Sequence, residues 1–452
     1  MSAMNNDVPN DDVIPDKKSY GLCGIQNVGN SCYMNTIIQC ISNCLLFREY
    51  LTHKEFVEPL MINIKKEFEK KKEEITIEEV RKEFNNTVTY QLFRVVKALW
   101  RANDCVLTID TFKNLFGDKI KMFYGYAQHD TQEALNSLFM TIENEVNIKR
   151  KFFLIENIAP DVKQLIEKRD NYSQYIRENN LTEDEKNKIF AEYEQYIKDN
   201  PIAVRRMDAY KSWKNYNNAN GNIIVDLFTG YFHVETTCPE CDTISDKFES
   251  FNCLPLTIIL KKEEKEKEKD QEEDKHLNIP HHWRSNKSNL INSEDVDIYT
   301  CLDNFYKAEK LDDDNKWYCD KCEKKVNAVR KFNLWKKPKV LIILLKRFDY
   351  ARHFKTSNKV KFPLKHLCLS NYDSYLEESS GEPDSYNLFA VSNHYGNMFG
   401  GHHLSYCKNT NGWYEFNDDK VKKICDFEKD DEESIDKEIV TKGAYLLFYE
   451  LQ

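Results

Sequence analysis

The sequence lacks any apolar run long enough to cross a bilayer, and residues 1–17 are polar, without the apolar core of a signal peptide. It also lacks a visible internal repeat. The formal net charge of −10 is spread along 452 residues, which argues against binding to a phosphate backbone, so we predict no nucleic-acid partner and no membrane span. We expect a soluble, monomeric, intracellular protein in the cytoplasm or, as an alternative, also in the nucleus.

The most informative segment, residues 21–35, sets a cysteine at the start of a predicted helix, behind a turn rich in Gly and Asn. With Ser31 as N-cap, Cys32 falls in the first helical turn, where unpaired N–H groups and the helix dipole favour the thiolate. Asn27 can direct its side-chain amide at a developing oxyanion. The alternative is that Cys32 is a small buried residue beside an ordinary turn. The helix is predicted from apolar residues at helical spacing: Met34, Ile37, Ile38, Ile41 and Leu45.

A base for such a nucleophile is available near the other end of the chain. Two glycines precede His402 and leave the backbone room for a ligand. Residues 402–408 and 413–417 alternate like strands around an Asn-Gly turn, which predicts a hairpin. Since antiparallel neighbours lie about 5 Å apart, the hairpin brings Asn417 or Asp418 near His402. The alternative for His402 is a structural histidine.

Cysteine, histidine and Asn or Asp, in this chain order, form the nucleophile, base and orienting residue of papain-like proteases. Residues 21–35 resemble the cysteine box of the ubiquitin-specific protease family of deubiquitinases (ubiquitin carboxyl-terminal hydrolases), and residues 395–417 resemble its histidine box. Residues 125–135 are similar to a third family motif. The resemblance covers most of the chain, because further segments also match family signatures: residues 224–230, 254–256, 337–348 and 443–449.

The resemblance implies a channel for the C-terminal tail of ubiquitin. In the family, the carboxylates corresponding to Asp130 and Glu133 bind the arginines of that tail through charge-assisted bonds, and the residue corresponding to Gln128 lines the channel. Without the resemblance, Asp130 and Glu133 would be an exposed acidic pair on one helix face. Small residues in the histidine box fit a channel that admits a Gly-Gly tail. The substrate-binding residues expected there are Tyr395, Gly396, Gly400 and Gly401.

Two C-x-x-C knuckles, Cys238 with Cys241 and Cys319 with Cys322, fit a tetrahedral site of four thiolates. A disulfide pairing or a redox motif is the less favoured alternative. The family's fingers subdomain carries such a site, so we expect structural Zn²⁺ with no catalytic role. Neither knuckle lies in a basic patch with interleaved aromatics, which argues against a nucleic-acid-binding ribbon.

The cysteines outside the predicted sites are scattered singly and fit a reducing compartment. They are Cys23, Cys40, Cys44, Cys105, Cys253, Cys301, Cys368, Cys407 and Cys425.

The predicted fold class is α+β, a papain-like cysteine protease with a helical thumb, a β-rich palm and zinc-ribbon fingers, as the resemblance implies. Hydrophobic residues make up 41% of the chain, enough for a sizeable core. We interpret the charged helical insertion, residues 149–220, as a set of solvent-exposed helices and not as a module that binds a partner. The expected order is a disordered tail (1–18), thumb with Cys32 (19–148), charged helical insertion (149–220), first knuckle of the fingers (221–260), charged flexible insertion (261–296), second knuckle with palm strands (297–345) and palm with His402 (346–452).

One departure from the family pattern is His403, which stands where the family usually has a tyrosine. Successive residues of a strand point to opposite faces, so one of the two adjacent histidines can reach Cys32. We predict His402, because it follows the two glycines as the family's base does. We further predict that Asn417 holds the imidazole while Asp418 assists.

The predicted reaction is thiol-dependent hydrolysis of the peptide or isopeptide bond after the C-terminal glycine of ubiquitin. Cys32 attacks the carbonyl, Asn27 and backbone N–H groups stabilise the oxyanion, and His402 protonates the leaving amine. The expected partners are therefore ubiquitin and ubiquitinated proteins. Two competing hypotheses are a catalytically inactive ubiquitin-binding scaffold and a protease for another ubiquitin-like modifier.

Overall fold

The computed structural model describes residues 20–71, 76–101, 104–149, 158–259, 295–349, 351, 353–376, 385–398 and 400–452. The predicted tail, residues 1–18, and the predicted flexible insertion up to residue 294 lie outside the described residues. None of the helices in these ranges is long and apolar enough to cross a membrane.

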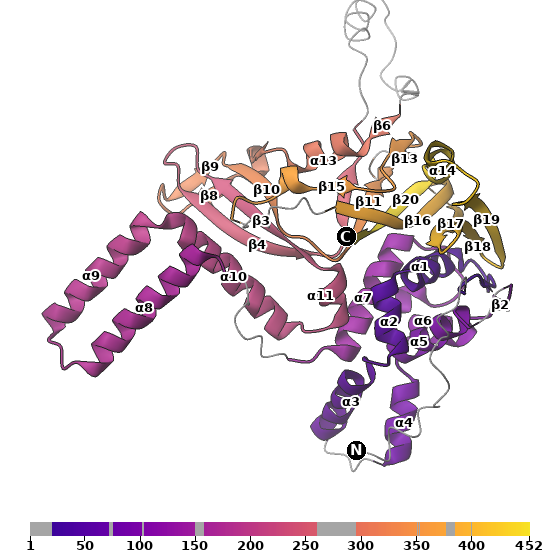
Figure 1. Cartoon of the computed structure of the whole chain (residues 1–452), viewed down its shortest axis with the longest axis horizontal. Coiled ribbons are helices and arrows are strands. Elements are labelled where there is room, and N and C mark those ends of the chain that lie inside the picture. Colours follow the sequence, from indigo (N-terminus) through magenta and orange to yellow (C-terminus); the bar gives the residue numbers. More distant parts are fainter. Residues whose placement is uncertain are drawn as a thin grey trace, which may run out of the picture.

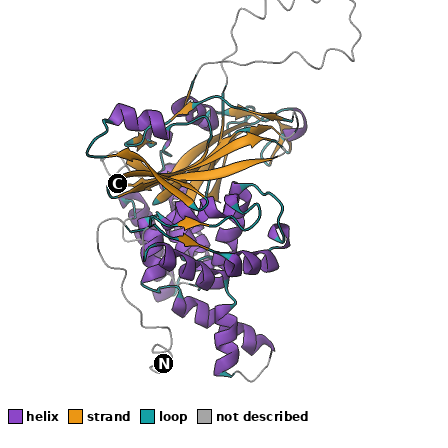
Figure 2. Cartoon of the chain, turned by 90° about the vertical axis from the view of Figure 1, so that its right-hand side faces the viewer, coloured by secondary structure: helices purple, strands orange, loops and turns teal. Residues whose placement is uncertain are grey.

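The N-terminal part folds into a helical lobe, the thumb, which Figure 2 shows beneath the strands. Its helices pack around buried residues such as Ile38, Leu92 and Phe139, and α1 is buried along its whole length. Local sequence signals fix their starts: Thr76 and Glu79 form a capping box, and Asp130 caps the last helix. The helices are α1 (Cys32–Ser42), α2 (Leu45–Thr52), α3 (Val57–Lys71), α4 (Ile77–Asn85), α5 (Val88–Leu99), α6 (Asp110–Lys119) and α7 (Thr131–Val146).

The palm is a mostly antiparallel sheet in the order β19-β18-β17-β16-β20-β11-β5, with β15 (Leu367–Cys368) also paired to β16. Helix α1 packs against β17, so the start of the thumb meets the middle of the sheet (Figure 1). Helix α14 (Glu432–Ile439) follows the sheet edge. The strands are β5 (Leu254–Thr257), β11 (Val340–Lys346), β16 (Ser385–Asn397), β17 (Gly400–Asn409), β18 (Gly412–Asn417), β19 (Lys420–Asp426) and β20 (Ala444–Leu451).

The fingers are a second sheet in the order β4-β3-β10-β7, which lies beside the palm in Figure 1. A small hairpin of β8 and β9 faces the end of β3 and carries the second knuckle. The elements are α11 (Ile223–Phe228), β3 (Gly230–Thr237), β4 (Ile244–Phe251), α13 (Ile298–Tyr306), β7 (Glu309–Lys310), β8 (Trp317–Cys319), β9 (Lys324–Val326) and β10 (Val329–Lys336).

The predicted helical insertion contains α8 (Pro160–Glu178), α9 (Glu183–Asp199) and α10 (Pro201–Ala219), and Figure 1 shows α8 and α9 projecting from the body. Helix α9 has no buried residue. Helix α10 is joined to the fingers by Arg205, which donates to Asp246 at 2.7 Å and to Glu235 at 2.8 Å. His233 also binds Asp246, at 2.6 Å. These side chains therefore form a polar network that fixes the start of α10 against the fingers.

Cys23 and Cys105 form a disulfide with their Cα atoms 4.7 Å apart. The short strands β1 (Gly24–Ile25) and β2 (Val106–Leu107) pair in parallel, so the residues preceding them lie side by side. The prediction that these two cysteines stay single was wrong, because a two-residue strand pair between distant segments leaves no sequence pattern. The disulfide also removes their support for a reducing compartment.

Candidate active site

Cys32 is the first residue of α1 and is 5% exposed. Ser31 precedes it as N-cap, but its hydroxyl accepts a bond from the Val28 N–H at 3.0 Å and does not cap the helix. The turn before it has positive φ at Gly29 (90°) and Asn30 (50°). A Cβ on Gly29 would lie 2.5 Å from the Tyr126 ring, so this close approach requires glycine.

His402, on β17, lies between Cys32 and Asn417. Its Nε2 is 2.7 Å from Asn417 Oδ1, as the predicted hairpin requires. The pKa of His402 is raised to about 9, and its interaction with Cys32 is the main cause. Partial burial lowers this pKa, whereas the hydrogen bond with Asn417 raises it further. The geometry is that of a nucleophile, a base and an orienting amide.

His403 points to the opposite face of β17. Its Nδ1 lies 2.6 Å from the Thr131 hydroxyl at the start of α7, and its ring lies 4.6 Å from that of His394. Burial lowers the pKa of His403 well below its ordinary value. The structure thus brings His402, and not His403, to Cys32.

Asp418 directly follows Asn417 and contacts Asn27 and Asn35 from the segment around Cys32. Its carboxylate accepts hydrogen bonds from Asn35 at 2.7 Å and from Asn27 at 2.8 Å, while its charge contributes to the raised pKa of His402. The Asn27 oxygen accepts from the N–H groups of Gly29 and Ser31. The amide of Asn27 is therefore fixed with its nitrogen toward Asp418, and its predicted role at the oxyanion stays a prediction.

Asp130 and Glu133 lie at the start of α7. One Asp130 oxygen accepts from the N–H groups of Gln132 and Glu133, and the other accepts from the Tyr445 hydroxyl at 2.7 Å. Glu133 is exposed. Its pKa is nevertheless raised, first by the partial loss of water around the carboxyl group and then by the negative charge of Asp130. Asp130 therefore joins the thumb to the palm, whereas the Glu133 carboxylate faces solvent.

A cavity of about 160 Å³ adjoins Cys32 and separates the start of α7 from the tip of the β16–β17 hairpin. Of the expected channel residues, Gln128, Asp130, Gly400 and Gly401 line it, whereas Glu133, Tyr395 and Gly396 do not. Tyr395 is 42% exposed and its ring lies against Gly443. Sequence reasoning missed several lining residues, His394 and His403 among them; the strand alternation that separates Tyr395 from His394 could have indicated the first.

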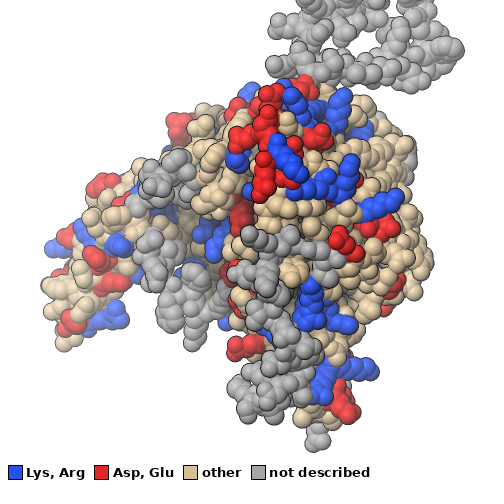
Figure 3. Space-filling view, turned by 45° about the vertical axis from the view of Figure 1, so that its right-hand side comes forward, with Lys and Arg blue, Asp and Glu red and all other residues tan. Residues whose placement is uncertain are grey.

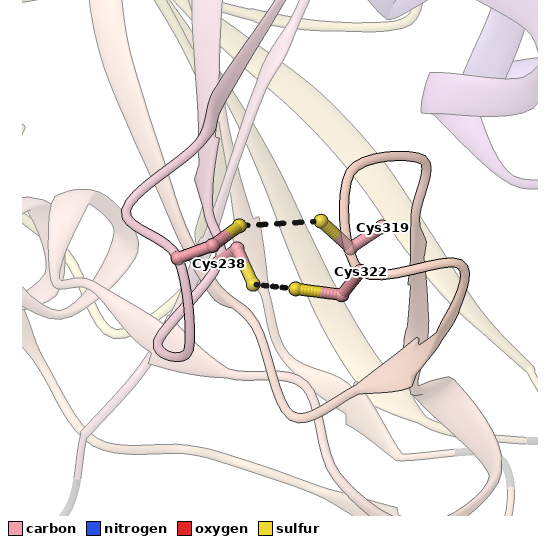
Figure 4. A group of neighbouring side chains, drawn as sticks. Cys238, Cys319 and Cys322 are labelled. Atoms are coloured by element: carbon pink, nitrogen blue, oxygen red, sulfur yellow. Dashed lines mark hydrogen bonds between the residues drawn. The ribbon is translucent and has the colours of Figure 1, made fainter.

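The two knuckles face each other across the end of the fingers (Figure 4). Cys238 Sγ lies 3.8 Å from Cys322 Sγ, and Cys241 Sγ lies 3.6 Å from Cys319 Sγ. A tetrahedron with Zn–S bonds of about 2.3 Å has S···S edges of about 3.8 Å, so the four thiolates fit such an ion. The residue after each knuckle, Asp242 or Glu323, has positive φ, 56° and 52°, which turns the chain back. These four cysteines form a cluster that could hold a metal ion.

A family model described as ubiquitin carboxyl-terminal hydrolase matches residues 23–449. The chain belongs to this family. It is 28% identical to a probable ubiquitin carboxyl-terminal hydrolase of Acanthamoeba polyphaga mimivirus, over 96% of this chain and 91% of that protein. It is 28% identical to ubiquitin carboxyl-terminal hydrolase 2 of Bos taurus and 27% identical to that of Homo sapiens, each over 98% of this chain. The chain spans 57% of the length of these two mammalian relatives.

Solved structures show the same fold. The SAGA DUB module containing Ubp8, bound to monoubiquitin, matches with a TM-score of 0.58 and 18% identity over 100% of this chain and 74% of that one. The module bound to ubiquitin aldehyde matches with a TM-score of 0.56 and 18% identity, over 97% and 71%. These comparisons confirm the predicted family, the mixed α and β fold and the class of enzyme, a cysteine-type deubiquitinase. The individual roles of the site residues stay predictions.

Proposed function

We propose that the chain hydrolyses the peptide or isopeptide bond after the C-terminal glycine of ubiquitin, with Cys32 as nucleophile. The observation that carries this assignment is the position of His402, whose Nε2 lies 2.7 Å from Asn417 Oδ1 and whose pKa is raised to about 9, mainly by its interaction with Cys32. The raised pKa of His402 favours its protonated form beside the sulfur, which suits a histidine that serves a cysteine nucleophile and then protonates the leaving group.

The reaction then runs in two steps. The Cys32 thiolate attacks the glycine carbonyl, and the oxyanion accepts hydrogen bonds from Asn27 and from backbone N–H groups at the start of α1. His402 donates its proton to the leaving lysine amine, and a thioester remains. His402, now neutral, removes a proton from water, which hydrolyses the thioester and restores Cys32.

The tail of ubiquitin is proposed to enter through the cavity beside Cys32. Glu133 supplies a solvent-facing carboxylate for an arginine of the tail, and Asp130 contributes its charge while it joins α7 to Tyr445. Gln128 accepts a bond from the Gly401 N–H at 3.3 Å and so borders the passage that leads to Cys32.

We propose that the four-cysteine cluster holds a structural zinc ion. With all four positions occupied by thiolates, zinc supplies cross-linking between the two knuckles and no Lewis acid for the reaction. Cys238 and Cys319 are fully buried, so this link is part of the folded fingers.

The proposed setting is a monomer in the cytoplasm, or also in the nucleus, without nucleic acid; the free cysteines support a reducing compartment, and the Cys23–Cys105 disulfide counts against one. On the face drawn in Figure 3, Lys and Arg side chains are interspersed with Asp and Glu, which supports the absence of a nucleic-acid partner. Fluorescence microscopy and light scattering test the location and the oligomeric state.

Turnover of ubiquitin carrying a C-terminal fluorogenic amide tests the assignment. We expect activity in the wild type, none in Cys32→Ala or His402→Ala, and residual activity in His403→Ala. Ubiquitin binding without turnover in the wild type would favour the scaffold hypothesis. Faster turnover of a tail-matched substrate made from another modifier would favour the other competing hypothesis.

A further inference from the structure

The tip of the β16–β17 hairpin extends beyond the palm sheet. β16 and β17 pair as far as Asn397 and Gly400, but the pairing of β16 with β20 ends at Asn393 and Ala444. The last backbone bond on that side runs from the His394 N–H to the Gly443 carbonyl, at 2.8 Å. From there on, the β20-facing edge of the tip has lost its strand partner.

Lys355 occupies the place of the missing strand. It ends β13 (Phe354–Lys355), and its Nζ donates to the His394 carbonyl at 3.0 Å and to the Gly396 carbonyl at 2.9 Å. Because these two residues are two apart in a strand, their carbonyls point to the same edge. Bonds from an ammonium group are charge-assisted, so one side chain replaces two links of a strand ladder.

The backbone that carries Lys355 is itself fixed to the palm. β13 pairs with β12 (Phe348–Asp349), which places Lys355 opposite Phe348. Arg347 is 1% exposed and donates to the carbonyls of Ala444, Thr356 and Asn358 at 2.6, 3.1 and 2.9 Å. Lys355 therefore reaches the tip from a segment tied to β20.

The tip is one wall of the cavity beside Cys32. It contributes His394, Asn397, Met398, Gly400 and Gly401, and the opposite wall contains Gln128 and Asp130. On the α7 side, Gln128 accepts from Gly401 at 3.3 Å, a longer bond to a neutral group. The stronger links to the tip are those of Lys355.

The charge of Lys355 also acts on the neighbouring imidazoles. Burial, and next the charge of Lys355, lower the pKa of His394 to about 4. Burial and the nearby positive groups, Lys355 among them, also lower the pKa of His403. Burial, and then this positive charge, favour the neutral forms of His394 and His403, although burial also lowers the pKa of Lys355 itself to about 8. The pKa of His402, by contrast, is raised.

We propose that Lys355 is a positioning residue, which holds the hairpin tip at residues 394–396 so that the cavity is formed before the ubiquitin tail enters. The inference rests on the proposed function for the identity of the tail. Among the described residues, Lys355 donates to the carbonyls of His394 and Gly396 and not to Cys32 or His402, so its effect should appear in tail binding more than in the chemical step.

Steady-state kinetics on the fluorogenic ubiquitin substrate test this role in the full chain. For Lys355→Met we expect KM to rise about tenfold with kcat within about twofold, since uniform binding is lost. Lys355→Arg should recover most of the loss, because its guanidinium can reach the same carbonyls. Lys365→Met, which removes an exposed ion pair with Glu432, is the matched control and should resemble the wild type.

Two further measurements separate positioning from damage to the fold or the chemistry. The rate of Cys32 alkylation by iodoacetamide should be equal in Lys355→Met and the wild type. An unchanged KM in Lys355→Met, or an equal loss of kcat and of alkylation rate, would overturn the proposal.

Ubiquitin binding in the Cys32→Ala background decides the inference without turnover. Adding Lys355→Met should weaken the Kd for ubiquitin about tenfold and should have no effect on ubiquitin lacking its C-terminal tail. An equal effect on both ligands contradicts the role of Lys355. If the wild type were inactive, the proposed function would be contradicted, but the role of Lys355 in binding could still be measured in this way.

Discussion

Asn27 and Asp418 are 391 residues apart in the chain, and Asn27 Nδ2 donates to Asp418 Oδ2 at 2.8 Å. Asp418 adopts a positive φ of 53° in the turn after β18, directly after Asn417. This contact ties the turn that carries Cys32 to the hairpin that orients His402. Asp418 thus contacts the predicted oxyanion amide, while Asn417 contacts the imidazole.

Asp418→Ala should lower kcat about tenfold or more, because it frees the Asn27 amide that we assign to the oxyanion. The check is a double-mutant cycle with Asn27→Ala on the fluorogenic substrate. If Asp418 acts through Asn27, the double variant is no slower than Asn27→Ala alone. Additive losses would show that Asp418 acts on another group.

The pH dependence follows from His402, whose pKa is raised to about 9 by Cys32 and then Asn417. A raised pKa means that the protonated form is favoured in the folded protein and is lost as the pH rises through about 9. We expect kcat/KM to fall over that range, and the apparent pKa of this fall belongs to the Cys32–His402 pair and not to one residue.

Asn417→Ala removes one of the causes that raise the pKa of His402, so the alkaline fall of kcat/KM should move to lower pH. The maximum of kcat should fall about hundredfold or more, as orientation of the imidazole is lost. A pH profile from 5 to about 10 measures both effects. An alkaline limb that stays in place would show that Asn417 does not orient His402.

The Cys23–Cys105 disulfide should stabilise the thumb. It closes a sequence separation of 82 residues, for which chain entropy predicts about 4 kcal/mol. Thermal unfolding without reductant should show a lower Tm for Cys105→Ser, with Cys368→Ser as a control that leaves the Tm unchanged. Reductant should lower the Tm of the wild type and not that of Cys105→Ser; equal Tm values throughout would contradict the bond.

Loss of the proposed zinc ion should affect the fingers and spare the catalytic pair. In Cys322→Ser we expect bound zinc to fall from about one ion per chain to near zero, because a thiolate ligand is lost. Ubiquitin turnover should fall, while iodoacetamide alkylation of Cys32 keeps its wild-type rate. Metal analysis that finds no zinc in the wild type would refute the site.

The residues around Cys32 and His402 could be predicted because their signals are local. The helical spacing of apolar residues after Cys32 placed it at a helix start, although Ser31 does not cap that helix, and the Asn-Gly turn set a hairpin register that puts Asn417 beside His402. The same reasoning separated His402 from His403, since neighbouring residues of a strand face opposite sides. The family resemblance supplied the class of substrate.

Other features depend on contacts that no local pattern encodes. The Cys23–Cys105 disulfide needs a two-residue pairing of β1 with β2, and the place of Asp418 depends on Asn27 and Asn35 from a distant segment. Such contacts arise in packing, after the elements have formed.

The most direct test of the central assignment is mass spectrometry of the chain after reaction with ubiquitin that carries a C-terminal electrophile. We predict that the wild type gains the mass of one ubiquitin, that the adduct maps to Cys32, and that Cys32→Ala gains none. An unmodified wild type, or an adduct of equal yield in Cys32→Ala, would contradict the assignment of Cys32 as the ubiquitin-directed nucleophile.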